Sequence, residues 1–182
     1  MMLESKLIQH AAPTLAGLKV ANLLCLPKNV ATVEAIRECQ KKMRGKGISL
    51  LCLREQYDRI LLYIFRPKRL MKWLEDAAVS DFLKRQGYEE TSLSGALQTL
   101  RIHFQRQEGF PHEIGIFLGY PIEDVEGFIQ HRGANCKYCG VWKVYGNVDE
   151  AKRLFQRYHK CQAVYERCYR AGFELPRLVV GI

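Results

Sequence analysis

Two apolar runs joined by a polar turn constrain the fold of this chain more than any other feature. Residues 48–54 and 59–66 are apolar at nearly every position, and Glu55-Gln56-Tyr57-Asp58 separates them. Short runs on either side of a polar turn are typical of a β-hairpin. Strands that lack polar alternation are typical of a sheet covered on both faces. The sequence therefore predicts a hairpin inside a well-covered sheet.

Helical patterns surround this hairpin. The expected helices cover, in order, residues 3–10, a stretch capped by Asn29 and reaching Met43, one starting at Pro67, one from Ser80 to Gly87, one between residues 91 and 109, one starting at Pro121, and a long one at 149–171. Further strands are expected at residues 19–26, 140–145 and 177–180. This order predicts a single α+β domain over residues 1–182, with a mixed sheet of about five short strands flanked by helices.

The composition is that of a folded protein with a basic surplus. Of the 182 residues, 48% are hydrophobic and 26% are charged, and the formal net charge is +9. These values exclude disordered, collagen-like and coiled-coil chains. No stretch approaches the ~18 apolar residues of a membrane span, and the first residues lack the apolar segment of a signal peptide. We therefore expect a cytoplasmic protein without a membrane partner.

Seven cysteines, an odd and scattered set, favour free thiols over a disulfide framework. Cys136 and Cys139 form a CxxC pair, the spacing of many zinc and redox sites. Cys161 and Cys168 do not complete a zinc site together, because seven residues of helix separate them by about 10.5 Å. We expect no stoichiometric metal, and we expect Cys161 and Cys168 to be buried on an apolar helix stripe.

His112 and Glu113 are adjacent and offer an imidazole and a carboxylate for acid–base chemistry. One interpretation is therefore an enzyme with His112 and Glu113 as catalytic groups. The other is structural: the pair begins a short helix, and Gly115 and Gly119 allow close packing. Adjacent side chains on a regular element do not converge, which favours the structural interpretation.

The expected long helix also carries a basic stripe. Arg153, Arg157, Lys160 and Arg167 follow i, i+4, i+7 and i+14, and so share one helix face. Such a stripe suits phosphate or nucleic acid, although most charged helix faces are simply solvated. No nucleic-acid-binding motif accompanies it, and no nucleotide-binding glycine motif or hydrolase elbow is present.

Several segments together carry a family resemblance. They are HEIGIFLGYPIEDVEGFI at 112–129, Trp142-Lys143-Val-Tyr145, the spaced residues Ala151, Phe155, Tyr158 and Cys161, and PTLAGLK at 13–19. The chain resembles the bacterial domain-of-unknown-function family 3793, met mainly in anaerobes, over essentially its whole length. The resemblance implies a bacterial cytosolic protein and no reaction type. Members often have Cys where this chain has Ala11.

The leading functional hypothesis is a ligand- or cofactor-handling protein, with a redox link through its thiols. We expect its site where residues 112–121, residues 136–145 and the long helix meet, with Lys143, Tyr145, Cys139 and Cys161 as binding residues. The sequence identifies neither the cofactor nor the small-molecule or redox partner. The alternatives are a phosphate- or nucleic-acid-binding module that uses the basic stripe, and an enzyme that uses the His112–Glu113 pair.

Overall fold

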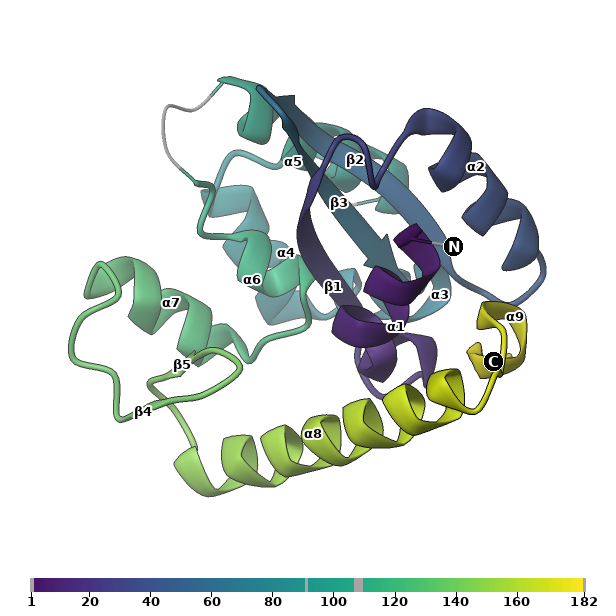
Figure 1. Ribbon diagram of the computed structural model, residues 1–182. Helices are drawn as coiled ribbons and strands as arrows, with labels where there is room; N and C mark the ends of the chain where they lie inside the picture. Colours follow the sequence, from purple (N-terminus) through teal and green to yellow (C-terminus); the bar gives the residue numbers. More distant parts are fainter. Residues whose placement is uncertain (1, 91, 107–109, 182) are drawn as a thin grey trace. The chain divides into compact units, whose positions relative to one another are not determined.

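The computed structural model describes residues 2–90, 92–106 and 110–181 (Figure 1). In chain order its elements are α1 (Met2–Leu15), β1 (Ala21–Pro27), α2 (Val33–Lys42), β2 (Ser49–Gln56), β3 (Arg59–Phe65), α3 (Pro67–Leu74), α4 (Ala77–Arg85), α5 (Leu93–Arg106), α6 (Ile114–Phe117), α7 (Ile122–Gln130), β4 (Tyr138–Cys139), β5 (Lys143–Val144), α8 (Val148–Arg170) and α9 (Leu175–Leu178). The predicted α+β class and the long helix near the C-terminus are confirmed.

The described strands form two antiparallel sheets, where the sequence suggested one mixed sheet. The first has the order β1-β3-β2, and the second pairs β4 with β5. The predicted hairpin is confirmed, with β2 and β3 paired from Ser49↔Phe65 to Gln56↔Arg59. Both faces of the central strand β3 are buried, since Leu62 and Tyr63 point to opposite sides and both are 0% exposed.

The chain divides into two compact units. Unit 1 comprises the described residues up to Leu70 together with those from Lys160 onward, and unit 2 is Met71–His159. Each unit is described below by itself. The expectation of a single domain stays a prediction.

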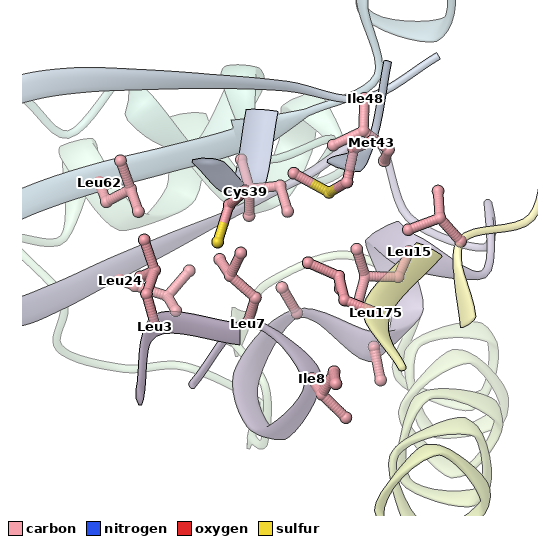
Figure 2. Close-up of a cluster of buried hydrophobic side chains, with 14 of the residues drawn as sticks. Leu3, Leu7, Ile8, Leu15, Leu24, Cys39, Met43, Ile48, Leu62 and Leu175 are labelled. Carbon is pink, nitrogen blue, oxygen red and sulfur yellow. The ribbon is translucent and has the colours of Figure 1, made fainter. Parts of the chain in front are cut away.

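The core of unit 1 lies between the three-stranded sheet and the helices α1, α2 and α9. Figure 2 shows Leu3 and Leu7 of α1 facing Leu24 and Leu62 of the sheet, and all four side chains are at most 4% exposed. Cys39 and Met43 contribute from α2 or its end, and Leu175 contributes from α9. Residues from both stretches of unit 1 therefore share one apolar core.

A buried arginine holds the end of α1. The sequence suggested that this helix ends at residue 10. In the structure α1 continues to Leu15, with a kink at Ala11 and with Pro13 inside it. Arg66, which follows β3, is 2% exposed. Its Nε donates to the carbonyl of Thr14 at 2.7 Å, and one terminal nitrogen donates to Leu15 at 2.6 Å and to Val180 at 2.8 Å. A cation at this place suits the negative end of the α1 dipole.

Several expected elements differ in the structure. The expected strand at residues 177–180 is replaced by the short helix α9, whose first turn contains Pro176, a position that suits the fixed φ of proline. The sequence suggested one strand at 140–145. The structure instead has a small hairpin of two strands, β4 and β5, of two residues each.

Two helix caps also differ from the expected ones. Asp76, not Ser80, caps α4 by accepting from the backbone N–H groups of Ala78 and Val79. Thr32, not Asn29, caps α2 by accepting from Ala35. In each case the residue that caps lies directly before the first helical residue, where its oxygen reaches the free N–H groups.

Candidate functional site

A pocket of about 370 Å³ lies within unit 2. Aromatic rings form much of its lining, with a small number of polar side chains among them. The aromatic residues are Phe110, Tyr120, Phe128 and Trp142, and the polar ones are His112, Asp124, Cys139 and Lys143. Residues from the 110–128 segment and from the β4–β5 hairpin thus line one concave site. Figure 1 shows α7 beside this hairpin.

Asp124 joins α7 to the hairpin. Its side chain is buried, and Oδ2 accepts from the indole Nε1–H of Trp142 at 2.7 Å. Its Oδ1 accepts from the backbone N–H groups of Tyr145 and Gly146, also at 2.7 Å each. The hydrogen bonds from these three donors to one buried carboxylate are strong and directional. Asp124 therefore fixes the position of the wall that carries Trp142.

Stacked aromatic rings make up that wall. The rings of Tyr120 and Trp142 stack with centroids 4.6 Å apart and planes 26° apart. Trp142 also meets Phe155 of α8 edge-on, at 4.5 Å and 88°. Gly140 lies so close to Phe155 that an added Cβ would fall 2.3 Å from its ring, so only glycine fits there. Burial raises the pKa of the Tyr120 hydroxyl to about 12, so the hydroxyl stays protonated further into the alkaline range than that of an ordinary tyrosine.

A lysine and a histidine lie against a third ring, that of Phe128. The ammonium of Lys143 donates to the carbonyl of Gly133 at 2.6 Å and lies 5.9 Å from the centroid of the Phe128 ring. The His112 ring meets Phe128 edge-on, with centroids 5.0 Å apart. Both groups belong to the pocket lining.

Glu113 does not pair with His112. Its buried carboxylate accepts from Nδ1–H of His103, a residue of α5, at 2.6 Å, and from the hydroxyl of Tyr88 at 3.3 Å. Burial and the nearby Glu113 carboxylate raise the pKa of Tyr88 well above its ordinary value. The structure therefore separates the two proposed catalytic groups, with His112 at the pocket and Glu113 in a buried network. Ten residues separate His103 from Glu113, and no sequence pattern links them.

The four expected binding residues occupy different places. Cys139 and Lys143 line the pocket. The Tyr145 side chain instead donates its hydroxyl to the Ala134 carbonyl at 2.9 Å and stacks on His131. Cys161 belongs to unit 1, where it packs against the apolar core, and burial raises its pKa to about 11. The structure brings together only Cys139 and Lys143.

The structure shows where the basic stripe lies and which His, Cys, Asp and Glu side chains of the described residues lie close together. Arg153, Arg157, Lys160 and Arg167 are all exposed on α8, and their binding of phosphate stays a prediction. Among the described residues, no three His, Cys, Asp or Glu side chains gather where they would hold a metal ion. None of the helices in the described part of the chain is both long and apolar enough to span a bilayer.

Together these features define a small α+β protein whose unit 2 carries an aromatic pocket with few polar groups. The chain belongs to the family described as "Protein of unknown function (DUF3793)", whose family model matches residues 7–179. This match confirms the resemblance drawn from the sequence. No curated protein and no solved structure matches the chain.

The burial of the thiols predicts the order in which they react. Cys25 and Cys139 are exposed, Cys161 and Cys168 are half-buried where full burial was expected, and Cys39 is buried. Burial raises the pKa of both Cys39 and Cys161 to about 11, which lowers their thiolate fraction at pH 8. We expect iodoacetamide to label Cys25 and Cys139 first and Cys39 last, as read by peptide mass mapping. Labelling of Cys161 as fast as Cys139 in the native protein, but not of Cys39, would contradict this order.

Proposed function

We propose that unit 2 binds a small, flat, largely apolar organic molecule in the pocket beside Trp142. The observation that carries this proposal is the lining: four aromatic side chains and four polar ones around a volume of about 370 Å³. Ligand pockets have this size and this character, with apolar walls and a few polar groups that fix orientation. This proposal keeps the leading sequence hypothesis of a ligand- or cofactor-handling protein.

The construction of the wall supports a planar ligand in particular. Three residues hold Trp142 in place. The Asp124 carboxylate accepts from its indole N–H, the Tyr120 ring stacks on it, and the Phe155 ring meets it edge-on. Aromatic pairs prefer stacked or edge-to-face contacts, so fixed rings select flat partners. At the mouth, Phe110 is 47% exposed and Val141 is 37% exposed, which leaves apolar surface available to an entering molecule.

The test uses 1-naphthylmethanol, a flat, neutral probe, and the two indole N–H signals of the ¹⁵N-labelled protein. We expect the Trp142 signal to move on titration, because its ring lines the pocket. Trp73 also belongs to unit 2, and its indole donates to the Ile116 carbonyl at 2.9 Å, outside the pocket lining. Its signal is the internal control and should move much less.

A substitution at the mouth gives the second measurement. Phe110→Ala should weaken binding of 1-naphthylmethanol about three- to tenfold, the effect of losing one aromatic contact. Met71→Ala is the matched control, because Met71 is also an exposed apolar residue of unit 2 but lies outside the lining. Equal shifts of both tryptophans, or equal affinity of all three proteins, would contradict the proposal.

A redox link to this function would act through Cys139, an exposed thiol of the lining three residues after Cys136. A redox-linked site predicts that probe affinity differs between the reduced protein and the protein oxidised with a disulfide reagent. Cys139→Ser should remove that difference, and circular dichroism of the reduced variant shows whether it is folded. Identical affinities in both redox states would leave a binding site without a redox role.

A further inference from the structure

Resting on the proposed function, we infer that the flat ligand of unit 2 carries a single negative charge, such as a carboxylate, and that Lys143 receives it. The inference follows from which charged groups of the pocket are still able to pair. Among the described lining residues, Asp124 is the one carboxylate and Lys143 is the one permanent cation.

Asp124 already has its partners. The side chain is 3% exposed, and its two oxygens accept from Trp142, Tyr145 and Gly146, each at 2.7 Å. A cationic ligand would have to compete with three short bonds on a carboxylate that it reaches poorly. The carboxylate of Asp124 is therefore stabilised by hydrogen bonds from the protein itself, and its oxygens are occupied.

Lys143 keeps the ability to bind. An ammonium group has three N–H donors, and in this structure one of them is given to the Gly133 carbonyl at 2.6 Å. The side chain is half-buried, so its charge is less screened than that of a fully exposed lysine. It lies beside the Phe128 ring, 5.9 Å from the centroid, where a flat molecule resting on that ring would place an anionic substituent within reach.

His112 adds a second hydrogen-bond donor to the lining of the pocket. Its ring lies against the same Phe128 side chain, and no hydrogen bond joins the ring nitrogens to another described residue. An imidazole N–H and an ammonium group in the lining of one pocket favour an oxyanion over a neutral or cationic substituent. With one lysine in the described lining, the matching ligand group carries a single negative charge.

The experiment compares three probes of nearly equal shape: 1-naphthoate, 1-naphthylmethanol and 1-naphthylmethylammonium. Dissociation constants are measured by calorimetry at low salt for the wild-type chain, Lys143→Met and Lys137→Met. Lys137 is the matched control, because it is an exposed lysine of the same segment that also donates to a backbone carbonyl, that of Gly146 at 3.2 Å, but lies outside the pocket lining.

We expect the wild-type chain to bind 1-naphthoate about tenfold more tightly than the alcohol, the size of one charge-assisted bond, and the ammonium probe least tightly. Lys143→Met should abolish this preference, so that 1-naphthoate and the alcohol bind the variant with dissociation constants within about twofold of each other. Circular dichroism shows whether the variant is folded. Lys137→Met should preserve the preference. If all three probes bind equally, or the ammonium probe binds best, the charge assignment is wrong while the pocket still binds ligands. If none of the probes binds, the proposed function fails as well.

Discussion

Replacing Arg66 with Met is expected to lower the free energy of unfolding of unit 1 by about 3–5 kcal/mol, because three hydrogen bonds from one charged donor are lost together. The guanidinium is buried and donates to the carbonyls of Thr14, Leu15 and Val180. Methionine fills similar space without any donor, so these carbonyls lose their bonds to a charged donor. Bonds of this kind are worth more than neutral ones.

Chemical unfolding followed by circular dichroism measures this loss, and fluorescence separates the units. Both tryptophans, Trp73 and Trp142, belong to unit 2, so their emission does not follow unit 1 directly. Arg59→Met is the matched control. Arg59 begins β3, the strand that Arg66 follows, and donates to the Cys25 carbonyl at 2.9 Å, but it is exposed. We expect the control to change stability by less than about 1 kcal/mol. Equal effects of the two substitutions would show that the buried bonds add nothing.

Replacing Asp124 with Ala is expected to be nearly as damaging, and its effect should be centred on the pocket. The substitution leaves the indole N–H of Trp142 and the backbone N–H groups of Tyr145 and Gly146 without their acceptor. Each buried donor left without a partner costs about 1–3 kcal/mol, less where water enters. We expect a loss of about 2–4 kcal/mol in unit 2 and at least a tenfold loss of affinity for 1-naphthylmethanol.

Hydrogen exchange at the amides of residues 145 and 146 localises this effect, because both amides lose protection when their acceptor is removed. Asp124→Asn should restore part of the stability, since the amide oxygen still accepts, although the amide NH₂ faces other donors. Asp81→Ala is the control: its carboxylate is exposed on α4 and lies 3.7 Å from Lys84. Unchanged exchange at residues 145 and 146 in Asp124→Ala would exclude a clamping role for this side chain.

The parts of the fold that local pattern determines could be predicted from the sequence. The hairpin of β2 and β3 is correct because two apolar runs and a short turn contain all the information needed to pair them. The expected strand at 177–180 is wrong because a run of three apolar residues fits a strand and a helix equally well, and Pro176 in the first turn favours the helix. The caps Asp76 and Thr32 were missed because several residues nearby have suitable side chains.

The site shows the same limit more clearly. Residues 112–121, residues 136–145 and the long helix were expected at the site. Residues of the first two segments line the pocket, and α8 contributes none of the described lining residues. The role of Asp124 could not be predicted, because its partners lie 18–22 residues later in the chain. The pairing of Glu113 with His103 is likewise set by tertiary packing. Single-sequence patterns report on neighbours along a helix or strand, and these contacts join different elements.

Because unit 1 is assembled from two stretches of chain with unit 2 between them, the order of synthesis matters for folding. Unit 2 is contiguous, so all of its residues have been synthesised before Lys160 is added. The sheet and α1 must meanwhile wait for Leu175 and Leu178 to complete their core and for Val180 to reach Arg66. Contacts between such distant stretches require closing a long loop, which slows folding. Unit 1 is therefore the part of the nascent chain that exposes apolar surface longest and gains most from a chaperone.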